Sequence, residues 1–574
     1  MTAGSENRPG PHHGRAVRTW PALVLTITAL AFGGLAVSGL VAPADSDQAR
    51  SARATITVAP GAPVSLPIPR SWLGLSTEYW TLPLFARQEV IFERVLRMLQ
   101  IPGAGPLVLR IGGDSADHSF WAPHAQRLPA WTFSLTPRWT AGVSGLVHRL
   151  ALRVILDLNL VTGSRLTAAA WARAAVARLP SHSVIGFEVG NEPDIYSHHF
   201  WSGITQEAAV AGHALPAALT PGAYLADFRA YARVLRRISP GVGVYGPALA
   251  RPRTDSAWVR ALVAARPPGL AAISVHRYPY TACARRPRAP TFPTVDRLLS
   301  RTATIGIAQS VDPALRIARR AGLPLALTEL NSVTCGGRAG VSDSFASALW
   351  LPAALFALLR EGVSAVDLHV RANTINAPFA LGPGGLTARP LLYGMLLFTR
   401  ALGAGAGLVP TRVRAGSRLH LAAWTVRAGQ HLRLVLVNAG PRSIRVRAVL
   451  PAGGPAVVQR LLAASPRARG GVTLDGQHLD RFGHWSGRAR PLRVMATGRV
   501  YTIVLPRHSA ALATVELTPD ATAAATPGYR RERAAITPAA RARDRPPAPP
   551  ACSRPRSRRS AAGQGHRRGR RSAC

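Results

Sequence analysis

Between positions 71 and 402 the sequence alternates eight short apolar runs with longer helical patterns, and this alternation constrains the fold more than any other feature. Helical stretches at 168–178 and 221–237 are examples, and Ser239-Pro240 ends the second one. Apolar strands separated by amphipathic helices indicate parallel β-α-β units. The expected strands lie at 72–78, 107–111, 154–159, 185–190, 242–246, 272–276, 325–328 and 366–370.

Eight such strands fit an α/β fold of the (β/α)8 TIM-barrel type, with the barrel at 71–402. A doubly wound parallel sheet is the competing arrangement. That sheet commonly carries a glycine-rich phosphate-binding turn after its first strand, and no such turn follows residues 72–78. The barrel is therefore the expected fold.

After position 402 the helical patterns give way to strand patterns. Gly, Pro and Asn stand at the joins between these segments, and no helical pattern separates them. This arrangement predicts an antiparallel β-sandwich at 403–517. The segment 54–70 is also strand-like, and we expect it to join that sandwich. The expected strands lie at 419–426, 432–437, 444–450 and 500–505.

The first 53 residues have the pattern of an export segment. Histidines and arginines precede an apolar stretch at 21–41, and Ala42-Pro43-Ala44 then offers a small-residue cleavage site. Residues 1–53 are therefore expected to be a cleaved signal peptide or an uncleaved signal anchor, followed by a linker. The apolar stretch is long enough for membrane anchoring. Either form predicts an extracellular or cell-surface protein.

The other end of the chain, at 518–574, is rich in Ala, Pro and Arg and has little with which to form a core. Such a composition predicts disorder. The tail could attach the protein to a polyanionic surface, or it could be a dispensable extension. Both interpretations stay open.

The charge is strongly basic, with 70 Lys+Arg against 27 Asp+Glu and a net charge of +43, and the sequence contains no lysine. Nucleic-acid binding is the usual interpretation of such basicity. The arginines are scattered through helical and strand patterns without an aromatic platform, so we expect no specific nucleic-acid partner. Cys283 and Cys335 follow two successive strand ends, which makes a disulfide reasonable without proving it. Neither has the neighbouring cysteine or histidine of a metal site.

Two glutamates stand where a buried strand ends and a polar loop begins. Glu192 follows the fourth strand in Gly190-Asn191-Glu192-Pro193, and Glu329 follows the seventh in Thr328-Glu329-Leu330-Asn331. Residues at the carboxyl ends of barrel strands converge on one face, so these carboxyl groups can meet. A pair of carboxyl groups is what glycoside hydrolysis requires. The competing interpretation of Glu192 is a simple helix cap.

Three further residues fit supporting positions. Asn191 has an amide suited to a sugar hydroxyl. Tyr278, in His276-Arg277-Tyr278-Pro279, can donate a hydrogen bond to Glu329, although ordinary packing would also explain it. Arg110 ends the second strand and could keep Glu329 ionised.

The chain resembles glycoside hydrolase family 79, the β-glucuronidases and heparanase-like enzymes of a clan of retaining barrel hydrolases. The resemblance covers about 54–517. It implies that Glu192 is the acid/base, that Glu329 is the nucleophile, and that Asn191, His276 and Tyr278 support them. The residues that carry it are 73–79, 110–114, 190–194, 276–279, 328–332 and 390–394, together with the terminal sandwich.

The remaining candidate residues would contact the substrate. Asp114 stands where the family leads us to expect an amide or hydroxyl residue. Arg371, in a segment where many clan members place a tryptophan, could pair with a uronate carboxylate; it could also be a solvated arginine. Glu78 could reach a sugar hydroxyl or serve the fold, and Asn373 follows the eighth strand.

We therefore expect an exported retaining glycosidase that cleaves β-linked glucuronides with no metal or organic cofactor. The alternatives are another retaining β-glycosidase of the xylosidase or glucosidase type, and a surface carbohydrate-binding protein without turnover. The carboxyl separation expected for retention is roughly 5–5.5 Å. Terminal or internal cleavage and the oligomeric state stay open.

Overall fold

The computed structural model of the chain describes residues 52–517 except 125–127, 197–218 and 373. Residues 1–51 of the expected export segment and linker, the arginine-rich tail and Asn373 therefore lie outside the described residues, whereas residues 52 and 53 belong to a strand. In the part that is described, no helix combines the length and apolarity needed to cross a membrane.

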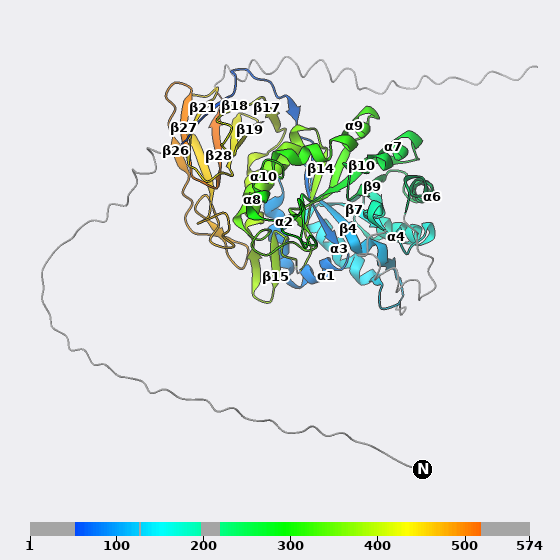
Figure 1. Cartoon of the computed structure of the whole chain (residues 1–574). Helices are drawn as coiled ribbons and strands as arrows, with labels where there is room; N and C mark the ends of the chain where they lie inside the picture. The colour runs from blue at the N-terminus through cyan, green and yellow to red at the C-terminus, as the bar shows by residue number, and fades with distance from the viewer. Residues whose placement is uncertain (1–51, 125–127, 197–218, 373, 518–574) are drawn as a thin grey trace, which may run out of the picture. The chain divides into compact units, whose positions relative to one another are not determined.

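Eight parallel strands close into a barrel in the order β10-β12-β14-β3-β4-β7-β8-β9, and Figure 1 shows helices around it. The predicted fold class is confirmed, and each predicted barrel strand overlaps an observed one. The barrel strands are β3 (Leu73–Glu78), β4 (Val108–Gly112), β7 (Arg153–Leu158), β8 (Val184–Val189), β9 (Gly243–Leu249), β10 (Leu270–Arg277), β12 (Leu325–Leu330) and β14 (Ala365–His369).

The helices of the barrel begin where sequence signals place them. The Ser164 side chain accepts from the backbone of α4, and Thr220 caps α6 ahead of a proline in the first turn. The two predicted helices lie within these elements. The helices are α1 (Thr81–Phe85), α2 (Glu89–Leu99), α3 (Pro137–Leu150), α4 (Arg165–Arg178), α6 (Pro221–Ile238), α7 (Ser256–Ala265), α8 (Val295–Leu298), α9 (Asp312–Arg320), α10 (Phe345–Arg360) and α11 (Pro390–Ala401).

The residues after α11 build two sheets that form a sandwich with strands from the segment before the barrel. The outer sheet has the order β18-β1-β21-β27, and the inner sheet runs β2-β17-β19-β20-β28-β22-β23. The strands are β1 (Ala52–Thr57), β2 (Leu66–Pro67), β17 (Gly407–Val409), β18 (Arg412–Ala415), β19 (Leu421–Ala428), β20 (His431–Asn438), β21 (Ile444–Val449), β22 (Ala456–Leu462), β23 (Thr473–Leu474), β26 (Leu492–Val494), which pairs with β22, β27 (Val500–Leu505) and β28 (Ser509–Glu516).

The four predicted sandwich strands correspond to β19, β20, β21 and β27, whereas β22 and β28 were not predicted. Four alanines and serines in the first five positions of β28 give it little intrinsic strand preference. Its place in the sheet comes from pairing with β20 on one side and β22 on the other. Tertiary pairing thus overrides local propensity here.

The inner sheet has two apolar faces. Along β20, Leu432, Leu434 and Leu436 belong to the core between the two sheets, whereas Val435 and Val437 belong to the core shared with the barrel helices. This follows from the two-residue period of a strand. The outer sheet is therefore covered on one side only, and its other face meets solvent.

Candidate active site

Glu192 and Glu329 meet at the carboxyl end of the barrel. Glu192 follows β8, and Glu329 is the fifth residue of β12. One carboxylate oxygen of each and a ring nitrogen of His276 all lie within 4.8 Å of one another. Strands that are far apart in the sequence thus bring both carboxyl groups to one point.

Both oxygens of Glu329 accept hydrogen bonds from groups that stabilise an anion. Arg110 Nη1 donates to Oε1 at 2.6 Å, and the Tyr278 hydroxyl donates to Oε2 at 2.8 Å. Burial opposes ionisation, but the charges of His369, His276 and Arg110 and the hydrogen bond from Tyr278 outweigh it and lower the pKa of Glu329. Glu329 is therefore a carboxylate at neutral pH.

Arg110 is fully buried and connects three carboxyl groups. Besides Glu329, its guanidinium donates to Glu188 Oε2 and Asp157 Oδ2, each at 2.8 Å. A fourth contact, at 3.0 Å, reaches Asn191 Oδ1. Such bonds orient Arg110 rigidly and hold its positive charge against Glu329.

Asp157 and Glu188 were missed by the sequence reasoning. Both are acidic residues inside otherwise apolar barrel strands, on β7 and β8. That anomaly was the available signal, because a charged residue is rarely fully buried without a partner. Burial raises the pKa of Asp157 well above its ordinary value although Arg110 opposes the shift.

Glu192 has fewer partners. His276 Nδ1 lies 3.0 Å from Oε1, and the Glu192 side chain is 17% exposed. The Glu192 backbone is left-handed, with φ 53°, and its amide donates to the Ala248 carbonyl. Non-glycine residues held in this region often mark functional sites. Although Glu192 precedes a short 3-10 helix (Pro193–Ile195), its side chain makes no capping bond, which argues against the capping interpretation.

The supporting residues lie around this pair. Asn191 accepts from Arg110 and donates from Nδ2 to Asp114 Oδ1 at 3.3 Å. Burial raises the pKa of Tyr278 well above its ordinary value, and the Glu329 charge adds to the rise, so its hydroxyl is a neutral donor. His276 is fully buried, and within the described residues its Nε2 has no hydrogen-bond partner.

His369, at the end of β14, is a site residue to which the sequence reasoning gave no role. Its Nδ1 lies 2.8 Å from the Tyr278 hydroxyl, and its Nε2 lies 3.6 Å from Glu78 Oε1. Burial lowers the pKa of His369, but Glu329 and Glu78 outweigh that effect and raise it. In the sequence, the segment that contains His369 suggests a role for Arg371 but none for the histidine. The three-dimensional contacts show that His369 lies between the carboxylates of Glu78 and Glu329.

The expected substrate-contact residues form a group beside the glutamates. Glu78 accepts from the Ser115 amide at 2.7 Å, whereas its Oε1 has no hydrogen-bond partner in the described part of the chain. Arg371 Nη1 lies 3.3 Å from Asp114 Oδ2, and its guanidinium stacks 5.2 Å from the Trp80 ring centre. Burial and the charges of Glu78, Glu192 and Glu329 raise the pKa of Asp114 well above its ordinary value.

Cys283 and Cys335 form a disulfide, which the sequence had left open. The two cysteines follow short strands that pair with each other, β11 (Tyr280–Thr281) and β13 (Val333–Thr334). Since these strands follow β10 and β12, the disulfide ties together the loops that leave Tyr278 and Glu329.

Glu192, His276 and Glu329 also lie close enough together to offer donor atoms to a metal ion. The donor set is one imidazole and two carboxylates. In the structure Arg110 balances the charge of Glu329, and His276 Nδ1 contacts Glu192. A two-carboxylate reaction uses these contacts directly, and the expectation of no cofactor stays a prediction.

The fold is similar to that of several solved glycoside hydrolases. A 4-O-α-L-rhamnosyl-β-D-glucuronidase from Fusarium oxysporum matches with a TM-score of 0.64 at 19% identity, covering 80% of this chain and 100% of that one. A family 51 arabinofuranosidase from Xanthomonas axonopodis matches with a TM-score of 0.61 at 14% identity, covering 81% and 100%. An α-L-arabinofuranosidase from Thermotoga maritima gives 0.60 at 17% identity, covering 81% and 100%.

No family model matches the sequence, and no curated protein does. The similarity to the solved structures therefore establishes the fold, a TIM barrel with an additional β-rich domain. Membership of family 79 stays a proposal.

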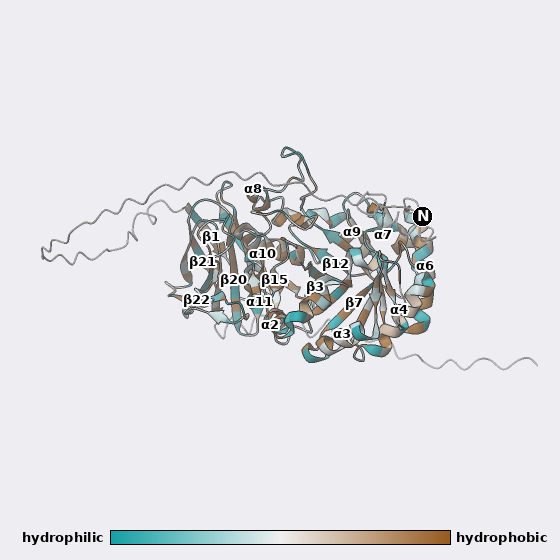
Figure 2. Ribbon diagram, turned by 90° about the horizontal axis from the view of Figure 1, so that it is seen from below, coloured by the Kyte–Doolittle hydropathy of each residue, from teal (hydrophilic) through white to brown (hydrophobic). Residues whose placement is uncertain are grey.

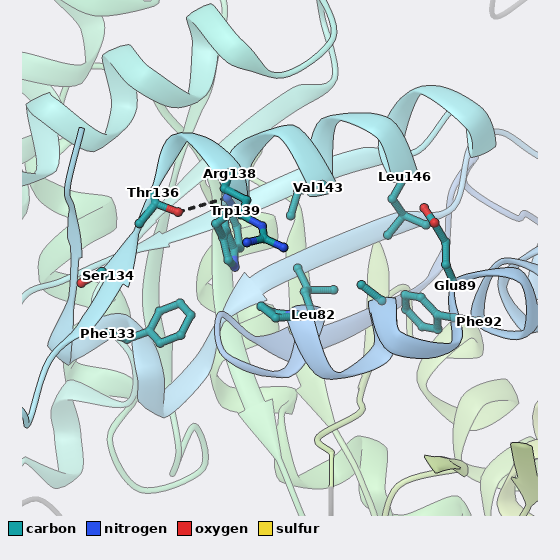
Figure 3. A pocket seen from close by; sticks show the side chains of 13 residues that line it. Leu82, Glu89, Phe92, Phe133, Ser134, Thr136, Arg138, Trp139, Val143 and Leu146 are labelled. Carbon is teal, nitrogen blue, oxygen red and sulfur yellow. Dashed lines mark hydrogen bonds between the residues drawn. The ribbon is translucent and has the colours of Figure 1, made fainter. Parts of the chain in front are cut away.

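A separate hollow of about 410 Å³ lies on the outside of the barrel, between α1, α2 and α3. Figure 3 shows Leu82, Phe92 and Phe133 on one side of it and the side chains of α3 on the other. None of the residues of the candidate active site lines it.

Proposed function

We propose that the chain is a retaining glycoside hydrolase. The observation that carries the proposal is the approach of Glu192 and Glu329 to within 4.8 Å in unlike surroundings. Retaining enzymes keep their carboxyl groups about 5–5.5 Å apart, whereas inverting enzymes leave about 6.5–9.5 Å for a water molecule. The short approach supports retention.

In the first step, Glu329 attacks the anomeric carbon and forms a glycosyl ester. The bond to the departing oxygen breaks, and Glu192 donates its proton to that oxygen. In the second step, Glu192 takes a proton from water, the water oxygen attacks the anomeric carbon, and Glu329 leaves as a carboxylate. The lowered pKa of Glu329 fits the role of nucleophile.

The proposed substrate is a β-linked glucuronide, and the support for it is the charge balance around Arg371. Burial raises the pKa of Asp114, the neighbour of Arg371, well above its ordinary value, and the charges of the three nearby glutamates add to the rise. The rise weakens the negative charge that Asp114 sets against Arg371, so the guanidinium can pair with the carboxylate of a uronic acid. Glu78 Oε1 and His369 Nε2 face each other at an ion-pair distance of 3.6 Å, but neither makes a hydrogen bond within the described residues, so both can bind sugar hydroxyls.

Arabinofuranosides are the second candidate, because several of the similar structures are arabinofuranosidases. Xylosides and glucosides complete the neutral alternatives. A carbohydrate-binding protein without turnover is less well supported, because binding needs neither a proton donor nor the ionised carboxylate that Arg110 and Tyr278 hold.

The test is aryl release from a β-D-glucuronide, a β-D-glucoside, a β-D-xyloside and an α-L-arabinofuranoside. We expect glucuronide-selective release that disappears in Glu329→Gln. Arg371→Gln should lose the selectivity, whereas the control Arg338→Gln, an arginine stacked on Phe292, should keep it. Release from a neutral glycoside alone would retain the mechanism and reject the uronate. Glycan binding without release from any substrate would reject the enzyme.

We also propose that the protein is exported. The disulfide between Cys283 and Cys335 supports this, because disulfides persist mainly in oxidising compartments. Whether the apolar stretch at 21–41 is cleaved or anchors the chain in a membrane can be tested by sequencing the N-terminus of the mature protein.

A further inference from the structure

The outer sheet of the sandwich has one face against the inner sheet and one face in solvent. Ala54 and Ile56 of β1 and Val446 of β21 point into the core between the sheets. The residues that alternate with them point outward. In Figure 2, β1 and β21 lie beyond β20 on the side away from α10, so the outward face is far from the barrel.

Arginines occupy five of the outward positions, and we call them the arginine face. Two come from the edge strand β18, and their strand partners are threonines of β1. Arg53 is directly paired with Arg445 on the neighbouring strand, and Thr55 lies between Arg414 and Arg447. The four strands contain no acidic residue. The arginine face comprises Arg53, Arg412, Arg414, Arg445 and Arg447.

The arginine face groups its arginines on one surface without an acid among them. Some exposed arginines elsewhere pair with acids, as Arg149 does with Glu89 and Glu93 across two helices. By contrast, over residues 52–517 apart from the three gaps, the arginine face other than Arg445 forms no ion pair. Like charges that lie close together on one face of a sheet repel each other, and an anionic partner would relieve that repulsion.

The spacing suits a linear polymer of anions. Alternate residues of one strand lie about 6.6–6.8 Å apart, and neighbouring strands lie about 4.7–4.9 Å apart. The face is therefore a shallow grid of guanidinium groups, each able to bind a carboxylate through two hydrogen bonds. A chain with regularly repeated carboxylates can cross several strands and contact more than one arginine.

A nucleic acid fits this surface less well. Single strands bind through stacking on exposed aromatic rings. The aromatic residue of the four strands, Tyr501, is buried in the core, and the other outward positions hold threonine and valine. The flat sheet also offers no helix to enter a major groove. The observations favour a polysaccharide.

We propose that the arginine face binds an anionic polysaccharide that carries regularly spaced carboxylates. Binding there would hold the polymer on the chain that carries the barrel and raise its local concentration. The binding itself does not depend on hydrolysis; only the benefit to turnover rests on the proposed function.

The test is the affinity of the full-length chain for polygalacturonate as a function of NaCl concentration. The quadruple variant Arg53→Gln, Arg412→Gln, Arg414→Gln and Arg447→Gln should bind at least about tenfold more weakly, with a shallower salt dependence. A control with the same charge change carries Gln at Arg173, Arg229, Arg233 and Arg260, exposed on barrel helices, and should stay within about twofold of the wild type.

Equal losses of affinity for polygalacturonate in the two quadruple variants, or no loss of affinity in the first, would overturn the proposal. If the wild type bound single-stranded DNA more tightly than polygalacturonate, and the first quadruple variant lost that binding to the same degree, the partner would be a nucleic acid and not a polysaccharide. If the quadruple variant does not fold, Arg412→Gln with Arg414→Gln on the edge strand should still weaken binding about threefold. Both variants should hydrolyse an aryl glycoside as the wild type does, and a wild type without hydrolysis would contradict the proposed function alone.

Discussion

Glu329 and Glu192 face each other across the barrel mouth, but the regions that hold them differ in kind. Glu329 is 5% exposed and contacts Arg110 and His369, so a guanidinium and a histidine with a raised pKa stabilise its carboxylate. The carboxyl group of Glu192 contacts a ring nitrogen of His276, and the turn that carries Glu192 is fixed by hydrogen bonds of its neighbours. Asp117 accepts from the Tyr196 hydroxyl at 2.9 Å, and that oxygen accepts from the Asn191 amide at 3.2 Å.

This difference separates two chemical tasks within one small site. In the proposed mechanism the nucleophile needs a stable negative charge, which Arg110 and His369 give to Glu329. A proton donor must give up and regain its proton, and Glu192 therefore needs surroundings without a fixed cation against each oxygen. Among the described residues no arginine contacts the Glu192 carboxyl group; one of its oxygens faces His276 Nδ1 at 3.0 Å, and the side chain is 17% exposed.

The largest expected effect comes from Glu329→Gln. The amide cannot form a glycosyl ester, so kcat should fall by at least about 10⁴-fold on every active glycoside. Because Gln keeps the side-chain shape, binding of a product sugar should persist, and calorimetry with the variant checks this. A variant that retains more than a tenth of its activity would show that Glu329 is not the nucleophile.

Glu192→Gln should have a smaller effect that depends on the leaving group. Loss of a general acid costs about 10²–10⁴-fold when the departing oxygen needs a proton. A nitrophenolate leaves without one, so the first step should be nearly unaffected and a burst of nitrophenol should precede slow turnover. Stopped-flow absorbance measures this on aryl glycosides whose phenol leaving groups differ in acidity. Equal losses of rate across the series would contradict the role of Glu192 as general acid.

Tyr278→Phe should remove one of the hydrogen bonds that stabilise the Glu329 carboxylate and leave the contact with Arg110 in place. A hydrogen bond to a charged group is worth about 1.5–3 kcal/mol, which corresponds to a loss of about 10–100-fold. The pH profile gives the sharper readout. The bond lowers the pKa of Glu329, so its loss should raise that pKa and move the acid limb of kcat/KM to higher pH. Tyr231→Phe, a buried tyrosine that donates to the Asn159 carbonyl, is the control and should leave the limb in place.

Asp117→Asn probes the turn that carries Glu192. Of the four substitutions it should have the smallest effect, and that effect should appear in the thermal stability. Burial raises the pKa of Asp117 to about 7, above its value in the unfolded chain. The protonated Asp117 carboxyl group therefore stabilises the folded state. This contribution to the free energy of unfolding is full below the pKa of the unfolded chain and is lost as the pH rises through about 7. The variant should show a Tm that falls less than that of the wild type between about pH 5 and pH 8. An identical slope would mean that Asp117 is ionised throughout.

The barrel and both glutamates could be predicted because local sequence determines them. Each barrel strand is a buried apolar run, and Glu192 and Glu329 stand where such runs end. The connections of Arg110 to Asp157 and Glu188 could not be predicted, because they join three strands whose register is set only when the barrel closes.

Two other features depended on contacts that the sequence does not contain. Asp114 departs from the residue type that the resemblance led us to expect, and only the structure shows its surroundings: burial, with the charges of three nearby glutamates, raises its pKa well above the ordinary value and so favours the protonated form. The strand β28 was missed because its alanines pack between two neighbours instead of following a strand pattern of their own.

The configuration of the first-formed sugar tests the central claim most directly. Proton NMR can follow hydrolysis of whichever aryl β-glycoside the enzyme cleaves, before the product equilibrates between anomers. With Glu192 and Glu329 within 4.8 Å, the account predicts that the β-anomer appears first. Initial appearance of the α-anomer would show single-step inversion and would contradict the assignment of Glu329 as a nucleophile.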